Sequence, residues 1–137
     1  MLAYMLDTSI AIYVIKRRPP AALELFNRHQ GRMTLSAVVL AELLHGADKS
    51  SDPARNTAVV EDFCSRLAVL DYGVKAAAHY GSIRSSLERL GTPIGVNDLH
   101  IAAHARSEGL TLVSNNLREF ERVPGLLTQN WAVGATR

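Results

Sequence analysis

Cysteine is almost absent from the sequence, because Cys64 is the only one among 137 residues. A single cysteine excludes an intramolecular disulfide and a zinc site built from several thiolates. This usage is typical of a reducing compartment, so we expect a cytoplasmic protein.

Long apolar runs are also missing at the N-terminus, where Met1 to Leu6 are followed at once by Asp7. Six residues are too few for the apolar core of a signal peptide or for a membrane span. The segment therefore predicts a buried strand, and we expect no membrane partner.

An excess of charge of one sign is lacking as well. Fifteen Lys and Arg against thirteen Asp and Glu give a net charge of +2, which by itself does not indicate nucleic-acid binding. With 47% hydrophobic and 20% charged residues, the composition is that of a globular protein, and the length suits one domain. We expect residues 1–137 to form that domain, with residues 131–137 as a loose C-terminal tail.

Short apolar segments alternate with helical patterns along the chain. Strands are predicted at residues 2–6, 33–35, 68–71, 110–113 and 126–130. Helices are predicted at residues 8–16, 20–30, 37–44, 53–67, 74–90 and 96–107, with a helical piece within 114–122. This alternation predicts an α/β fold with a mostly parallel central sheet of about four to five strands flanked by helices.

Asp7 stands at the carboxyl end of the first predicted strand, where parallel sheets place their active sites. The alternative role is a simple helix cap. Thr8 and Ser9 can cap the helix instead and leave Asp7 free.

Glu42 is the one charged residue in the apolar segment from Ala37 to Leu44, so we expect a buried helix. An ionised carboxylate in an apolar interior is costly unless it is paired, protonated or bound to a metal. A salt bridge to a distant Arg is the simpler alternative.

Asp98 lies near the start of the helix predicted at residues 96–107, where it can also be a cap. Ala102 and Ala105 fall within about 40° of it around the helix, which leaves room beside the acid. On the same helix His100 and His104 have the i, i+4 spacing of a zinc pair. However, Ile101 stands where the zinc-protease pattern needs Glu, so we expect partly buried or surface histidines.

Asn116 and Glu119 follow the strand at 110–113 and can face the same way on a helical turn. They can complete an acidic site there, or belong to a solvated charged helix.

Four segments resemble the VapC toxins of bacterial VapBC toxin–antitoxin pairs, which are PIN-domain proteins. The segments are Leu6–Ser9, Ala41–Gly46, Pro93–Ala105 and Leu112–Leu126. Their order and spacing make the resemblance specific over nearly the whole chain.

The resemblance implies a PIN-like domain and an endoribonuclease that requires Mg²⁺ or Mn²⁺. It implies Asp7, Glu42 and Asp98 as metal-binding catalytic acids, and Glu119 or Asn116 at the fourth position. Ser9 and Ser114 match residues that orient the acids. The expected products carry 5′-phosphate and 3′-hydroxyl ends.

The resemblance also implies partners. The expected substrate is structured RNA, first a tRNA cut near its anticodon and next ribosomal RNA. The residues expected to contact phosphates are Lys16, Arg17, Arg118 and Arg122. A VapB-type antitoxin is expected across the acidic groove, together with homodimers and toxin–antitoxin hetero-oligomers.

Other functions remain open at this point. A phosphatase with Asp7 as nucleophile needs a second Asp where Ser9 stands. A PIN-domain nuclease for ribosomal RNA or mRNA outside a toxin–antitoxin system, or a catalytically silent RNA-binding module, keeps the fold with a different role.

Overall fold

The computed structural model describes residues 1–132 and contains a five-stranded sheet whose neighbouring strands all run parallel. The strand order is β3-β2-β1-β4-β5. The strands are β1 (Tyr4–Leu6), β2 (Met33–Ser36), β3 (Ala68–Leu70), β4 (Thr111–Val113) and β5 (Thr128–Gln129). The predicted α/β fold with a parallel sheet of four to five strands is confirmed.

The sheet is built around β1, which pairs with β2 on one side and β4 on the other. Met5 lies beside Thr34 and Leu112, and all three residues have no exposed surface. Parallel strands covered on both faces are continuously apolar, which explains why so short a segment forms the centre of the core.

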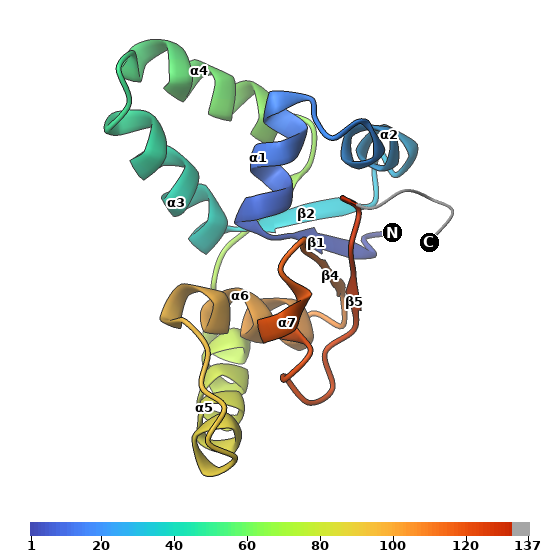
Figure 1. The fold of residues 1–137 in the computed structure, drawn as a ribbon, viewed down its shortest axis with the longest axis vertical. Coiled ribbons are helices and arrows are strands. Elements are labelled where there is room, and N and C mark those ends of the chain that lie inside the picture. The colour runs from blue at the N-terminus through green and yellow to red at the C-terminus, as the bar shows by residue number, and fades with distance from the viewer. Residues whose placement is uncertain (133–137) are drawn as a thin grey trace.

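Helices cover both faces of the sheet. They are α1 (Thr8–Lys16), α2 (Pro20–Arg28), α3 (Ala37–Asp48), α4 (Pro53–Cys64), α5 (Val74–Arg89), α6 (Val96–Ser107) and α7 (Leu117–Phe120). Figure 1 shows α1 to α4 on one side of the sheet and α5 to α7 on the other. Residues 1–132 contain no helix of the length and apolarity needed to cross a bilayer.

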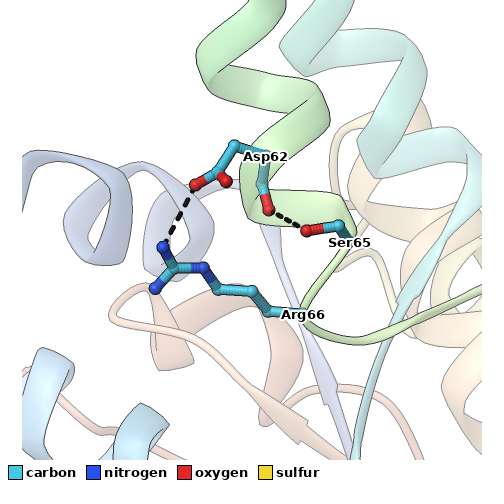
Figure 2. A network of polar contacts seen from close by, with 3 residues as sticks. All are labelled: Asp62, Ser65 and Arg66. Carbon is cyan, nitrogen blue, oxygen red and sulfur yellow. Dashed lines mark hydrogen bonds and ion pairs between the residues drawn. The ribbon is translucent and has the colours of Figure 1, made fainter.

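Four helix ends differ from the predicted ones. α2 ends at Arg28 rather than at residue 30, and α5 ends at Arg89 rather than at residue 90. α3 was expected to end at Leu44, with Gly46 just beyond it, but the helix continues through Gly46 to Asp48. Burial of Ala47 in the core outweighs the roughly 1 kcal/mol helix cost of a glycine. α4 ends at Cys64 rather than at Leu67, because the Ser65 hydroxyl donates to the Asp62 carbonyl at 2.6 Å and closes the last turn (Figure 2).

The chain after β5 returns to the start of the sheet. Trp131 is only 2% exposed, and its ring lies 5.2 Å from that of Tyr4 and 5.1 Å from that of His29. The expected loose tail is therefore wrong for Trp131, because this large ring completes the core beside β1. Residues 133–137 of that predicted tail lie outside the described residues.

Candidate active site

Four acidic side chains gather at the carboxyl edge of the sheet. Asp7 follows β1 directly, Glu42 is carried by α3 after β2, and Asp98 lies in the first turn of α6. Glu119 comes from α7, which follows β4. All three other acids lie close enough to Asp98 for their charges to raise its pKa. The sequence therefore singled out residues that the fold brings together.

Asp7 is the N-cap of α1 and also the most buried of the four acids, with 4% of its surface exposed. Its Oδ1 accepts from the Ile10 backbone N–H at 2.9 Å and from the Ser9 hydroxyl at 2.8 Å. The prediction that Thr8 or Ser9 caps the helix is wrong, because the extended backbone at Asp7 sets its own carboxylate over the first turn. Oδ2 takes part in neither of these two bonds.

Burial raises the pKa of Asp7, and the charge of Glu42 raises it further. Hydrogen bonding by Ser114, by the Ile10 N–H and by Ser9 lowers the same pKa, because these donors stabilise the carboxylate.

Glu42 is half-buried and is held at both of its carboxylate oxygens. The Thr8 hydroxyl donates to Oε1, and Asn97 Nδ2 donates to Oε2 at 3.1 Å. The expected burial of the whole helix is wrong, because α3 is buried only along Val39, Leu43 and Ala47. Its outer face is open and borders a surface pocket next to Glu42.

Asp98 and Glu119 form a pair. Burial raises the pKa of Asp98 to about 7, helped by the charge of Glu119 and a hydrogen bond with it, and then by the charges of Asp7 and Glu42. Gly95 is the N-cap of α6, so Asp98 does not cap that helix.

Asn116 and Glu119, between which the sequence left a choice, lie together. Glu119 Oε1 accepts from the Gly95 N–H at 3.2 Å, and Oε2 accepts from Asn116 Nδ2 at 3.1 Å. Glu119 thus supplies the fourth carboxylate beside Asp98, and Asn116 holds it.

Within residues 1–132, none of these four acids forms an ion pair. Each ion pair in that part of the chain involves a different acid, and the pairs are Glu24–Arg28, Asp62–Arg66, Glu88–Arg84 and Glu108–Lys75. Figure 2 shows one of them, with Arg66 Nη2 at 3.1 Å from Asp62 Oδ2. The distant Arg considered as a partner for Glu42 is therefore not found. In the described part of the chain, the repulsion at the carboxyl edge is therefore not offset by an ion pair.

The donor set suits a hard divalent cation. In residues 1–132, no three acidic, histidine or cysteine side chains converge tightly enough to enclose a metal ion by themselves. Mg²⁺ keeps several waters and is often held by one or two carboxylates together with substrate phosphate. An open, oxygen-only cluster without thiolates fits that mode of binding and fits Mn²⁺ equally.

The serines expected to orient the acids both lie at the site. Ser9 donates to Asp7 and accepts from the Asn115 backbone N–H at 3.4 Å, which ties α1 to the loop after β4. Ser114 is fully buried and accepts from the Asn116 N–H at 2.7 Å.

The four predicted RNA-binding residues occupy different places. Lys16 lines a groove that also contains Glu42, whereas Arg17 lines a separate pocket with Asp62. Arg118 is exposed on α7. Arg122 donates to the Pro93 carbonyl at 3.0 Å, so part of its guanidinium is already engaged.

The two histidines of α6 make contacts inside the fold; the prediction of partly buried or surface histidines is confirmed for His100 and wrong for His104, which is fully buried. His104 is 1% exposed, and its Nδ1 lies 2.7 Å from the Ser36 hydroxyl. His100 is half-buried, lies 2.8 Å from the Tyr72 hydroxyl and stacks on Tyr80 with 4.2 Å between ring centroids. One ring nitrogen of each histidine therefore has a hydrogen-bond partner inside the fold.

Two residues that hold Glu42 were not identified from the sequence. Thr8 was treated as a helix cap, and Asn97 was given no role. Their position in the sequence could have indicated this role, because Thr8 directly follows Asp7 and Asn97 directly precedes Asp98.

Comparison with known proteins decides the family, because residues 4–126 match the PIN domain. The chain belongs to the PIN-domain family, among its VapC ribonucleases. Ribonuclease VapC2 of Haemophilus influenzae is 63% identical over 131 residues, which cover 96% of this chain and 99% of that protein. The tRNA(fMet)-specific endonuclease VapC of Shigella flexneri is 54% identical, covering 96% of this chain and all of that protein.

Solved structures agree with this assignment. The PIN domain here matches the DNA-bound VapBC of Salmonella typhimurium with a TM-score of 0.92 and 53% identity, over 96% of this chain and 99% of that one. It matches VapBC2 of Rickettsia felis with a TM-score of 0.89 and 39% identity, over 95% and 99% of the two chains. The predicted resemblance to VapC toxins and the predicted nuclease class are confirmed.

Proposed function

We propose that this PIN domain is the toxin of a toxin–antitoxin pair and that it hydrolyses structured RNA with Mg²⁺ or Mn²⁺ as cofactor. The observation that carries the proposal is a cluster of four carboxylates that form no ion pair within residues 1–132. Three of them, Asp7, Glu42 and Glu119, are held by hydroxyl, amide and backbone N–H donors. Such a cluster attracts a cation, and a cation in turn attracts a phosphodiester.

In this proposal Asp7, Glu42 and Asp98 would hold the cation together with waters and the substrate phosphate, and Glu119 acts with Asp98. When bound, a divalent ion supplies the positive charge that aligns the scissile phosphate and stabilises the charge developing on it. Burial and the neighbouring carboxylates raise the pKa of Asp98 to about 7 in the metal-free protein, so binding of a cation there should release a proton at neutral pH. Ser9, Ser114 and Asn116 keep Asp7 and Glu119 in place.

The substrate we propose is tRNA, cut near its anticodon to give 5′-phosphate and 3′-hydroxyl ends. Two relatives that are 54% and 53% identical to the chain are named tRNA(fMet)-specific endonucleases. Lys16, Arg17, Arg118 and Arg122 are the proposed phosphate contacts, and Lys16 lines the same groove as Glu42.

The proposed partner is a VapB-type antitoxin. A groove between α1, α3 and α4 is lined by apolar side chains, among them Ile12, Leu43 and Val59, and it reaches Glu42. A segment with apolar residues for the groove and an Arg for the carboxylates suits this surface, since a guanidinium pairs with a carboxylate through two parallel hydrogen bonds. Homodimers and toxin–antitoxin hetero-oligomers belong to the same proposal.

The direct test is cleavage of purified tRNA by the isolated protein. Cleavage should need Mg²⁺ or Mn²⁺ and stop with a chelator, and Asp7→Asn should reduce it at least about a hundredfold. Asn is as good an N-cap as Asp, so this variant should keep its fold. Cleavage without a metal, or full activity of Asp7→Asn, would overturn the proposal, and sequencing of the new 5′ ends would identify the cut.

A further inference from the structure

We infer that Thr8 and Asn97 are positioning residues that together fix the carboxylate of Glu42 in its place in the active site. The inference rests on the proposed function, because it concerns the same acidic cluster. It gives a positioning role to two uncharged side chains, each of which donates a hydrogen bond to Glu42.

The two residues grip opposite oxygens of one carboxylate. Thr8 donates to Oε1, and Asn97 Nδ2 donates to Oε2 at 3.1 Å. The bonds join residues 34 and 55 positions apart in the chain, so they connect separate elements of the fold. Glu42 is therefore held from two sides and from two different helices.

The position of each donor in the chain matters. Thr8 is the first residue of α1 and directly follows Asp7, whereas Asn97 precedes Asp98 in the first turn of α6. The residue next to each of these acids thus binds the third acid. Through these neighbours, the spacing of Asp7, Glu42 and Asp98 is set by two hydrogen bonds.

Glu42 has particular need of such support. It has a long, flexible side chain, it is only half-buried, and it projects from a helix with an open outer face. Glu42 lines two surface pockets, one shared with Lys16 and one shared with Asn97. Without partners, the carboxylate would sample several rotamers in these open spaces.

The chemistry of the donors is also suited to the task. An Arg or Lys would hold the carboxylate equally well, but its charge would compete with a divalent cation for the same oxygens. A hydroxyl and an amide fix the carboxylate and leave its negative charge intact. Each oxygen of a carboxylate also has a second lone pair, which remains for a cation or a water.

Variants can separate the effect of the position of the Glu42 carboxylate from the effect of its charge. Thr8→Val and Asn97→Ala remove the donors and keep the charge of Glu42. Glu42→Gln removes the charge, yet its amide can still accept from Asn97 and donate to Thr8, because a hydroxyl both donates and accepts. Thr8→Ser retains the hydroxyl as a conservative rescue, and Asn27→Ala removes an exposed amide from α2 as the matched control.

The experiment measures Mn²⁺ affinity of the RNA-free protein together with kcat and KM for tRNA. We expect Thr8→Val and Asn97→Ala each to lower Mn²⁺ affinity and kcat roughly tenfold with little change in KM, as loss of a residue that orients a metal ligand does. Thr8→Ser and Asn27→Ala should match the unchanged protein. Unaltered Mn²⁺ affinity and kcat in both donor variants would overturn the inference, even if their Tm falls.

A double-mutant cycle with Glu42→Ala makes the test specific. Once the Glu42 side chain is absent, Asn97→Ala should reduce Mn²⁺ affinity no further, because Asn97 then has nothing to hold. An undiminished effect in that background would show that Asn97 acts elsewhere and would overturn the inference. Because Mn²⁺ binding needs no RNA, coupling in the cycle without tRNA cleavage would uphold the positioning role while the proposed function fails.

Discussion

The acidic residues of the outer helices and those of the carboxyl edge are held in opposite ways. Glu24, Asp62 and Glu88 are exposed and lie one helical turn from an Arg that neutralises them. Asp7, Glu42 and Glu119 bind hydroxyl, amide and backbone N–H groups instead. The first arrangement solubilises a helix, and the second preserves negative charge.

This difference has an energetic consequence. Exposed ion pairs contribute about 0–1 kcal/mol each, so the outer acids matter little to either stability or chemistry. Burial raises the pKa of both Asp7 and Asp98, and repulsion from the neighbouring carboxyl-edge acids raises it further. Regions that keep such uncompensated charge trade stability for function.

The largest effect that separates the two groups should come from Asp98→Asn. It should reduce RNA cleavage at least about a hundredfold and at the same time stabilise the metal-free protein at pH 8 by up to about 1 kcal/mol, since a repelled charge is removed. Cleavage rates and urea unfolding measure the two outcomes. An Asp98→Asn protein that is less stable at pH 8 would contradict the comparison, because it would mean that the charge is compensated.

The next largest effect is on the pH dependence of the free energy of unfolding. Asp98 has a pKa of about 7 in the fold against an ordinary value of 3.8, so between these values the folded chain binds more protons than the unfolded chain. The metal-free protein should therefore lose stability as pH rises from about 4 to 7, with no further loss from this group above it. The raised pKa of Asp7 acts in the same direction. Urea midpoints measured across this range should slope downwards, and less steeply in Asp98→Asn.

Added Mg²⁺ should stabilise the protein through the carboxyl-edge acids. Because a metal needs the deprotonated carboxylate, the rise in Tm caused by Mg²⁺ should be larger at pH 8 than at pH 6. Asp98→Asn should show a smaller rise at both values. An equal Mg²⁺ effect at the two pH values would mean that the cation binds away from Asp98.

A smaller effect is expected from Lys16→Ala. Lys16 shares a groove with Glu42 without forming an ion pair with it, so we expect it to serve RNA phosphates. The change should weaken RNA binding a few-fold and reduce the slope of log K against log salt by about 1, with kcat unchanged. Salt titrations of RNA binding test this, and an unchanged slope would remove Lys16 from the interface.

The smallest effect should come from the outer group. Asp62→Asn breaks the ion pair with Arg66 and should cost about 0.2–1 kcal/mol, less at high salt. RNA cleavage and Mn²⁺ affinity should stay as they are. A loss of cleavage in this variant would show that the two groups of acids are not independent.

Local signals explain what the sequence predicted well. The helix at 96–107 was predicted with its observed bounds, and its start was indicated by the turn Pro93-Ile94-Gly95 directly before it. The alternation of short apolar strands with helices was enough for a parallel sheet, and the sheet in turn placed Asp7 at its carboxyl edge.

The features that were not predicted from the sequence depend on tertiary packing. The role of Asn97 is defined by Glu42, 55 residues away, and no local pattern encodes that contact. The length of α3 depended on the burial of Ala47, and the place of Glu119 depended on where α7 begins. For Asp7, a role as helix cap does not exclude a role in the proposed metal site. Its Oδ1 caps α1, and this leaves Oδ2 for a cation.

The fluorescence of Trp131 can report on the folding of the chain. It is the only tryptophan in the sequence, it is almost fully buried, and it stacks on His29 and against Tyr4 where the sheet begins. Its emission should therefore follow the docking of the last strand and the unfolding of the core, whereas the proposed site for ions and RNA lies at the opposite end of β1. Fluorescence can thus track folding in each variant while binding and cleavage are recorded through separate signals.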